Sequence, residues 1–410
     1  MRIRDRHLGI DVNFANPAAW ADPYPLYAWL REASPMVRCR QPFVGRAWAA
    51  TRYDDVSSVL KDPKRFKSSH SGANGRQAIY ERVLPRLVQG FMKSMVSSDG
   101  DDHRRLRGLV AKAFTPARVE QLESRIDGIV TQLLDRAMAS ATFDLMAAFA
   151  LPLPLRIISE LLGVEAHERA NFRRAMVRII ADRSEWSLIY RLPTYWELRR
   201  MFDRMLARKR ARPTDDLTSD LIAVEQAGDQ LTAEELVSMV FLLLFAGHET
   251  TVNLLGNGTL ALLEHPEQFA RLRDDPSLVP SAIEEMLRFD SPAHFSATRY
   301  VAERCEVGGM VLERGDKILP MLGAANRDGR AFDEPDAFDV GREPNRHVAF
   351  GAGPHFCIGA HLSRFEGRIA LTRLVQRCPG LRLAVGRDAL RWRQNNSGLR
   401  GLTALPVRGS

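Results

Sequence analysis

The chain has 410 residues, of which 45% are hydrophobic and 26% are charged, and its net charge is +8. These proportions exclude a disordered or fibrous protein and are typical of a soluble globular protein large enough to enclose a cofactor. The N-terminus has no apolar core of a signal peptide, and the longest apolar run, Met239 to Gly247, is too short to span a bilayer. We therefore expect a cytoplasmic protein without a membrane anchor.

Charge and cysteine usage limit the possible partners. The four cysteines are scattered and form no C-x-x-C pair, which favours a reducing compartment over a disulfide framework. The positive net charge indicates either a solvated basic surface or a docking face for an acidic partner protein. Nucleic acid is not expected as a partner, because the arginines are dispersed and no binding module is recognisable.

Hydrophobic periodicity predicts a mainly α-helical fold with small β-sheets. No internal repeat, low-complexity tract or long linker divides the chain, so we expect a single domain over residues 1–410. The expected elements, in chain order, are strands Met36–Cys39 and Ala47–Thr51, a long loop with a short helix at Phe66–Val96, helices Glu120–Met138, Leu153–Leu162, His167–Ala181 and Leu192–Arg212, a long helix at Leu236–Leu263, strands Arg299–Val301 and Lys317–Met321, a helix at Ala360–Leu374 and strand-like sequence in Gly401–Val407.

Four basic side chains could each be either an ordinary surface charge or part of a binding site. His103 and Arg107 are spaced i, i+4 and therefore share one helix face. Arg299 begins a predicted strand, and His347 lies shortly before a glycine-rich segment. Taken singly, each is best explained as a solvated charge.

The long helix is predicted to cross the interior and to carry polar chemistry at its middle. Thr232 and Glu235 form a capping box before the apolar run, which is apolar nearly all round. The run Ala246-Gly247-His248-Glu249-Thr250-Thr251 interrupts it with groups that are costly to bury unless they are hydrogen-bonded or hydrated. Gly247 would allow a planar group to approach the backbone, and Thr250 could bond to an earlier carbonyl and open the helix. A zinc-protease H-E-x-x-H motif is excluded, because Val252 stands at the second His position.

Glu285 and Arg288 are spaced i, i+3 on the next helical segment. An isolated pair at this spacing usually lies at the surface and contributes little to stability.

The segment Phe350 to Gly359 places Cys357 in a glycine-rich loop directly before a helix. The free amides and the dipole at a helix N-terminus are expected to lower the pKa of this thiol and to make it a soft metal ligand. Phe350 and Phe356 could shield the sulfur from water. A single thiolate without a second ligand at zinc spacing fits an iron held mainly by a porphyrin. A buried, inert cysteine beside a glycine turn is the alternative.

This loop resembles the haem-ligand loop of the cytochrome P450 family, F-x-x-G-x-x-x-C-x-G, with all four fixed positions filled by Phe350, Gly353, Cys357 and Gly359. The polar run in the long helix is similar to the family's oxygen-activation motif, A/G-G-x-D/E-T. The resemblance extends over about residues 21–407 and is closest to the soluble bacterial branch. Two loop positions depart from the family pattern, at Gly100-Asp101-Asp102 and at Gly329.

The resemblance implies the cytochrome P450 fold, a triangular helical prism with haem between the long central helix and the helix after the cysteine loop. A helix-rich core is then expected over about residues 97–380. A smaller β-rich region is expected from about residues 21–65, 292–325 and 381–407.

The resemblance also implies roles for individual residues. Cys357 would be the axial ligand of the haem iron, and Thr250 and Glu249 would be catalytic, supplying protons as O2 is activated. Glu285, Arg288 and Arg342 would form a structural triad that holds the cysteine loop. The haem propionates would bind to His103, Arg107, Arg299 and His347. The haem would also contact Phe350, Gly351, Gly359, Ala246 and Gly247.

The substrate pocket is expected at Leu243, Ala246, Gly247, Ala293, His294, Phe295 and Gly398. Trp186, Tyr190, Tyr195 and Trp196 could form an aromatic roof over it, although ordinary helix packing explains them equally well.

The function implied is a monomeric haem-thiolate monooxygenase with haem b as cofactor and O2 as co-substrate. It would hydroxylate or epoxidise a lipophilic small molecule such as a secondary metabolite, steroid, terpenoid or fatty acid. NAD(P)H would supply electrons through a ferredoxin reductase and a ferredoxin. The ferredoxin is expected on a basic patch of Arg104, Arg105, Lys112, Arg364 and Arg368. A haem-thiolate peroxygenase, an isomerase-like enzyme and a non-catalytic haem-binding sensor or carrier remain as alternatives.

Overall fold

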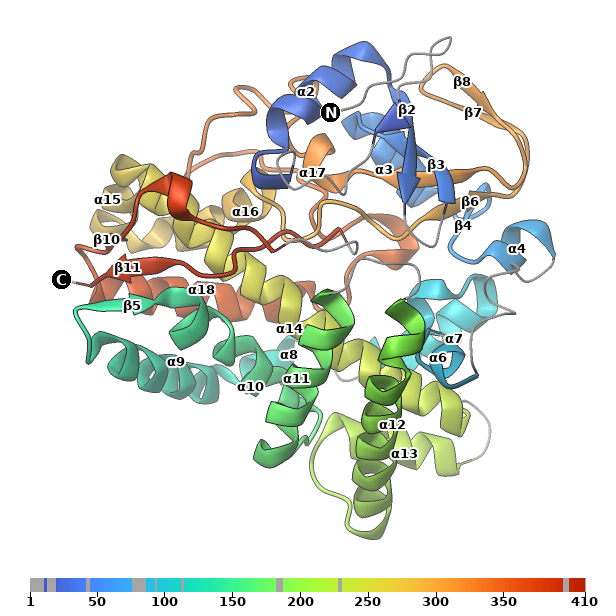
Figure 1. Cartoon of the computed structure of the whole chain (residues 1–410), viewed down its shortest axis with the longest axis horizontal. Helices are drawn as coiled ribbons and strands as arrows, with labels where there is room; N and C mark the ends of the chain where they lie inside the picture. Colours follow the sequence, from blue (N-terminus) through green and yellow to red (C-terminus); the bar gives the residue numbers. More distant parts are fainter. Residues whose placement is uncertain are drawn as a thin grey trace.

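The computed structural model describes residues 11–12, 20–41, 45–75, 86–92, 94–111, 114–181, 187–227, 231–393 and 398–409. Helices make up most of this part of the chain, and the strands form small sheets at its margins (Figure 1). The expected mainly helical fold with small β-sheets is therefore confirmed.

The first half of the chain holds the following helices: α2 (Tyr24–Ala33), α3 (Tyr53–Lys61), α4 (His70–Asn74), α6 (Arg86–Met92), η1 (Met95–Ser97), α7 (Gly100–Ala111), α8 (Pro116–Glu120), α9 (Glu123–Met138), η2 (Met146–Ala150), α10 (Pro152–Leu161), α11 (Ala166–Ala181) and α12 (Ser187–Ala211). The second half holds α13 (Leu217–Gln226), α14 (Ala233–Glu264), α15 (Pro266–Asp274), η3 (Pro276–Leu278), α16 (Val279–Phe289), α17 (Leu322–Ala325), η4 (Gly353–His355), α18 (Ala360–Arg377) and η5 (Arg387–Ala389).

Within the described residues, the largest sheet has six strands in the order β1-β2-β3-β9-β6-β4. Its strands are β1 (Asp11–Val12), β2 (Met36–Gln41), β3 (Gly45–Ala50), β4 (Phe66–Lys67), β6 (Arg299–Val301) and β9 (Lys317–Pro320). Trp48 on β3 is in register with Ile318 on β9, so distant parts of the sequence meet in this sheet. The remaining strands are β5 (Thr142–Asp144), β10 (Arg382–Leu383) and β11 (Pro406–Arg408) in one sheet and the hairpin β7 (Cys305–Val307) and β8 (Met310–Leu312).

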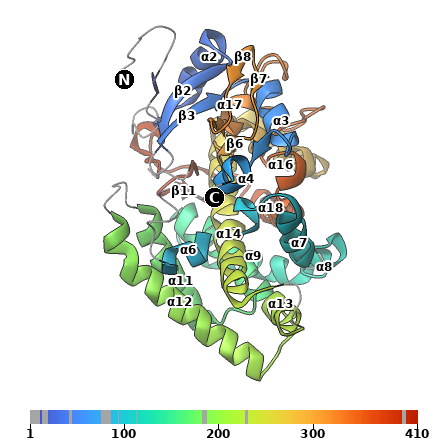
Figure 2. The same cartoon turned by 90° about the vertical axis from the view of Figure 1, so that its right-hand side faces the viewer.

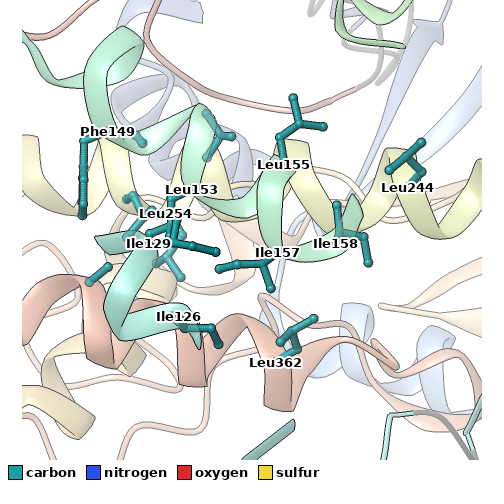
Figure 3. Close-up of a cluster of buried hydrophobic side chains, with 14 of the residues drawn as sticks. Ile126, Ile129, Phe149, Leu153, Leu155, Ile157, Ile158, Leu244, Leu254 and Leu362 are labelled. Atoms are coloured by element: carbon teal, nitrogen blue, oxygen red, sulfur yellow. The ribbon is translucent and has the colours of Figure 1, made fainter. Parts of the chain in front are cut away.

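Helix α14 forms the axis of the molecule. The expected capping box is present at its start, where the Thr232 amide donates to Glu235 and the Glu235 amide donates to Thr232 Oγ1. The helix packs against α6, α10, α16 and α18. Figure 3 shows the core on one side of it, with side chains from α9, α10 and α18 around Leu254. Burial of this apolar surface is the main contribution to the stability of the fold.

By length and composition, α14 could cross a membrane, and it is the one helix of the described residues that could. The apolar run Met239–Gly247 is too short to span a bilayer by itself, and only the whole helix is long enough. Within the fold, 61% of its most apolar window is buried against protein. The apolar side chains of α14 therefore pack in the protein interior.

Most predicted elements are present with shifted ends. The clearest differences concern the segment 66–96, which contains a strand and helices α4 and α6 in its described part rather than a long loop with one short helix. Helix α12 begins five residues before the expected Leu192, although Pro193 lies inside it. In Gly401–Val407, regular strand structure is limited to its end, within β11.

Candidate active site

A cavity of about 280 Å³ lies between the middle of α14 and the loop before α18. Its lining includes thirteen of the residues expected to contact cofactor or substrate: Leu243, Ala246, Gly247, Thr250, Ala293, Phe295, Arg299, His103, Arg107, Phe350, Gly351, Cys357 and Gly359. Four other expected residues, Glu249, His294, His347 and Gly398, are not part of this lining. The wall is predominantly apolar, so the cavity suits an apolar occupant.

The loop that presents Cys357 folds back on itself through its own backbone. The Cys357 amide donates to the Phe350 carbonyl at 2.9 Å, and the Ala360 amide donates to the Cys357 carbonyl at 3.3 Å. Gly353 has a φ of +68°, and a Cβ there would collide with the backbone of α3 at Leu60. Glycine is therefore required at this position for the loop to lie against α3.

Cys357 lines the cavity and is exposed to it, although the surrounding protein removes much of the water from its neighbourhood. Burial raises the pKa of this thiol, and the Gly359 amide, Arg107 and Arg364 lower it by less. The expected lowering of the thiol pKa was therefore wrong, because desolvation of the thiolate outweighs the helix terminus. A metal cation beside the sulfur would supply the missing compensation.

Four basic side chains gather on one side of the cavity: His103, Arg107, Arg299 and His355. The rings of His103 and His355 lie 4.1 Å apart. Burial and the neighbouring cations lower the pKa of His103, and they lower the pKa of His355 to about 3. Burial also lowers the pKa of Arg299 to about 10.

This cluster lacks a matching negative charge among the described residues. Asp99 acts on it from a distance, but its carboxylate already accepts hydrogen bonds from Ser68 and Ser69. Buried cations without partners are unfavourable, so a ligand with two carboxylates would relieve the repulsion. Opposite a soft sulfur ligand, this donor set fits a haem with its two propionates.

The structure corrects one of the expected propionate partners. His347 Nε2 donates to Glu284 at 3.0 Å and lies outside the cavity, whereas His355 lies in it. Sequence analysis overlooked His355 although it precedes Cys357 by only two residues. Its closeness to Cys357 in sequence was the available signal. In the structure, His355 follows the turn of η4 and bonds to Ser68 at 2.8 Å.

Thr250 and Gly247 have different roles in the middle of α14. Thr250 Oγ1 donates to the Ala246 carbonyl at 2.9 Å, so the expected local bond is confirmed. The hydroxyl oxygen lines the cavity and can accept a further hydrogen bond. A Cβ on Gly247 would meet Ile158 of α10 at 2.9 Å, so glycine here serves helix packing as well as the cavity.

Glu249, the expected proton-supply residue, lies outside the cavity lining. Its carboxylate is 4% exposed and pairs with Arg393 Nη1 at 2.5 Å. His248 Nε2 lies 3.6 Å from the same carboxylate. The helical rotation between adjacent residues separates them, so the carboxylate and the Thr250 hydroxyl lie on different faces of α14.

Glu285, Arg288 and Arg342 meet in a buried network. Arg288 donates to both Glu285 oxygens at 2.7 and 2.8 Å, and Arg342 Nε donates to them at 3.1 and 3.2 Å. Both Glu285 and Arg288 are fully buried. The remaining donors of Arg342 bind the carbonyls of the segment 333–337, so the network ties α16 to the chain that leads into the cysteine loop.

Two expected pocket residues support the wall rather than form it. His294 is fully buried and bonds to Tyr27 at 2.9 Å and to Asp290 at 3.3 Å. Gly398 has a φ of +76°, and a Cβ there would strike the ring of Phe295. Both residues therefore lie behind the cavity wall and support Ala293 and Phe295, which line it.

The expected aromatic roof is also absent from the cavity lining in the described residues. Tyr195 packs on Phe91 with ring centroids 5.8 Å apart, and Trp196 is 51% exposed. Trp186 and the side chain of Tyr190 lie outside the described residues. The alternative of ordinary helix packing is correct for Tyr195.

Glu366 on α18 is a second residue that sequence analysis overlooked. It is fully buried at the edge of the cavity, and neither carboxylate oxygen has a hydrogen-bond partner among the described residues. Burial raises its pKa well above the usual value. A glutamate on an otherwise apolar helix face was the available signal.

Replacement of Glu366 by Gln should therefore stabilise the protein, relative to wild type, as pH rises. The unfolded carboxyl ionises near about 4.3. Above that pH, the wild-type protein loses about 1.4 kcal/mol of stability for each further pH unit, until the raised pKa of the folded protein is reached. Urea unfolding of both proteins at acidic and neutral pH should show a difference that widens with pH. A constant difference, or an equal one for the exposed Glu306→Gln control, would contradict this reasoning.

Comparison with known proteins agrees with this geometry. The family model described as Cytochrome P450 matches residues 45–380. Cytochrome P450 107B1 of Saccharopolyspora erythraea is 45% identical over 390 residues, covering 94% of this chain and 95% of that protein. From the same organism, 6-deoxyerythronolide B hydroxylase is 39% identical over 395 residues, covering 94% of this chain and 96% of that protein.

A solved structure gives the same result. The myxobacterial cytochrome P450 CYP267B1 in complex with myristic acid has a TM-score of 0.88 at 39% identity, covering 96% of this chain and 98% of that one. The expected cytochrome P450 fold is confirmed. The chain therefore belongs to the cytochrome P450 family and is a monooxygenase, an oxidoreductase that incorporates one oxygen atom from O2.

Proposed function

We propose that this monooxygenase hydroxylates or epoxidises a lipophilic small molecule held in the cavity between α14 and the cysteine loop. The observation that carries the proposal is the convergence of three features on one space: apolar walls, the Thr250 hydroxyl and the Cys357 sulfur. A secondary metabolite, steroid, terpenoid or fatty acid suits such walls. The names of the relatives support this range, since one is a 6-deoxyerythronolide B hydroxylase and another was solved with myristic acid.

The cofactor in this proposal is haem b. Cys357 binds the iron, and the four basic residues His103, Arg107, Arg299 and His355 bind the propionates. Ala246 and Gly247 on α14, and Phe350, Gly351 and Gly359 in the cysteine loop, line the space that the ring would occupy. When bound, the haem would supply an iron at which O2 can be bound and reduced. The Glu285 network fixes the loop in which the sulfur is held.

Protons reach the reaction space through α14 in this proposal. Thr250 lines the cavity, and because its hydroxyl donates to the Ala246 carbonyl, its oxygen is oriented to accept a hydrogen bond from a proton carrier there. Glu249 acts from behind the helix, where it is paired with Arg393. The acid and the alcohol thus divide the task between a proton reserve and an oriented hydroxyl inside the cavity.

Electrons in this proposal come from NAD(P)H through a reductase and a ferredoxin, to a monomeric, cytoplasmic, single-domain enzyme. The predicted ferredoxin patch needs revision. Arg105 pairs with Glu235 at 2.7 Å, and Arg364 forms two 2.7 Å bonds with Glu284, so neither is free for a partner. Arg104 pairs with Asp101, but both side chains are exposed, Arg368 is exposed, and Lys112 lies outside the described residues.

Thr250→Ala is the test of this function. The variant should still consume NAD(P)H, but product formed per electron pair should fall by roughly tenfold to a hundredfold, with hydrogen peroxide rising in its place. The fall is expected because no hydroxyl remains in the cavity to accept a hydrogen bond from a proton carrier. Product and peroxide are measured together with a substrate found by titration of the haem absorption band.

Thr250→Ser is the matched control and should retain coupled turnover, since it keeps the hydroxyl. Equal product from wild type and Thr250→Ala with added peroxide alone would favour the peroxygenase. A wild-type protein that binds ligands but forms no product with NAD(P)H, ferredoxin and reductase would favour the sensor.

A further inference from the structure

The excess positive charge of this chain is concentrated in one segment. Residues 166–212 contain 13 Lys or Arg and 5 Asp or Glu, a net charge of +8 that equals that of the whole chain. The remaining residues are neutral in total. In the structure this segment forms α11 and α12, which pack against each other. The net charge is therefore a local property of this helix pair.

Several of these cations are balanced by acids. Arg199 pairs with Asp203 at 2.8 Å, Arg208 pairs with Glu168 at 2.9 Å, and Arg210 pairs with Glu225 at 2.9 Å. These pairs leave part of the charge uncompensated, and the uncompensated part has a definite place on α12.

That place is the basic stripe, defined here as Trp196, Arg200 and Arg204. The three are spaced i, i+4 along one exposed face of α12. The Arg200 guanidinium lies 3.3 Å from the centre of the Trp196 ring, and Trp196 is 51% exposed. Neither arginine has an acidic partner among the described residues. Exposed tryptophan and arginine are the side chains most enriched where proteins bind each other.

The basic stripe lies on the substrate side of the molecule. Next to Trp196, Tyr195 packs on Phe91 of α6, and Phe91 packs on Phe241 of α14 at 4.9 Å. The following residues, Leu242 and Leu243, line the cavity. Figure 2 shows α11 and α12 on one side of α14, with α7 and α18 on the other. The stripe is thus separated by α14 from the helix that follows Cys357.

We propose that the basic stripe binds an acidic protein that delivers the substrate. This protein is distinct from the one that donates electrons. An electron donor would bind nearer to Cys357, on the side of α18. An exposed tryptophan beside two arginines is typical of protein interfaces, so we choose a protein as the occupant and test an anionic membrane as the alternative. The assignment of this side to the substrate rests on the proposed function, whereas the docking itself is measured without turnover.

The test compares two variants with the same change in net charge. Arg200→Glu/Arg204→Glu reverses the stripe, and Arg104→Glu/Arg368→Glu reverses two exposed arginines on α7 and α18. The holoenzyme is titrated into fluorescein-labelled polyglutamate, and binding is followed by anisotropy at several salt concentrations. Reversal of the stripe should weaken binding by about tenfold or more, and the control should weaken it much less. Ferredoxin-driven reduction of the haem should be slowed by the control and unchanged by reversal of the stripe.

Equal losses of binding in the two variants would contradict the proposal, because net charge alone would then explain the affinity. A slower reduction by ferredoxin on reversal of the stripe would assign it to the electron donor instead. Preferential binding of wild type to phosphatidylglycerol vesicles over polyglutamate would also overturn it. Circular dichroism of both variants checks that the helices are intact, and failure of substrate turnover in wild type would leave the binding results valid.

Discussion

Glu285→Gln is expected to lower the free energy of unfolding by about 3–5 kcal/mol. Glu285 is fully buried and accepts hydrogen bonds from Arg288, Arg342 and Asn345. The amide removes the negative charge and leaves a fully buried Arg288 without compensation. Because Arg342 also binds the segment before the cysteine loop, the loss should loosen that loop along with α16.

Urea unfolding followed by circular dichroism measures the change, with haem content recorded on the same samples. Glu32→Gln is the matched control, since Glu32 pairs with Arg330 at an exposed position and its replacement should leave the stability nearly unchanged. Similar destabilisation by both changes would show that burial of the Glu285 network has no special importance. Failure of Glu285→Gln to accumulate as folded protein, with normal yield of the control, would agree with the expectation.

The helical fold and its central element could be predicted from the sequence because their causes are local. The capping box at Thr232 and the apolar run after it define α14 without reference to any other segment. The strands were harder to place, because β3 and β9 gain their register from each other across a long separation in sequence. Segments such as α12 also depart from local rules, since Pro193 is tolerated inside it.

Site residues could be predicted where a motif specifies one residue. The prediction failed where the direction of a side chain decides whether it reaches the cavity. Cys357 and Thr250 lie on the cavity as expected. His347 and His355 are both histidines of the same loop, and only the turn of η4 determines which one faces Arg299. Side-chain direction also separates Glu249 from Thr250, because one step along a helix rotates a side chain to another face.

Electrostatic partners were the least predictable feature. Arg105 and Arg364 look like free surface charges in the sequence, yet each has an acidic partner more than 75 residues away. Such pairs depend on tertiary packing that local patterns do not contain. For the same reason, the sequence does not show that the carboxylate of Glu366 lacks hydrogen-bond partners among the described residues.

Cys357→Ser should abolish monooxygenation and remove the red-shifted absorption of the reduced, carbon monoxide-bound protein that is typical of a sulfur ligand. The change is nearly isosteric, and the four basic residues His103, Arg107, Arg299 and His355 remain to hold the propionates, so bound haem should persist in part. Product formation should fall to the background of the assay, because a neutral hydroxyl donates far less electron density to iron than a thiolate does.

Cys305→Ser is the matched control for that change. Cys305 lies on β7, outside the cavity lining, and its replacement should leave both the spectrum and the turnover unchanged. Retention of the sulfur-type spectrum in Cys357→Ser would require another cysteine as ligand. Cys39 and Cys378 are buried, and neither lines the cavity, so the structure offers no other described thiol that could take that place. The spectrum of this one variant therefore tests the orientation of the cofactor between α14 and α18 as well as the identity of its ligand.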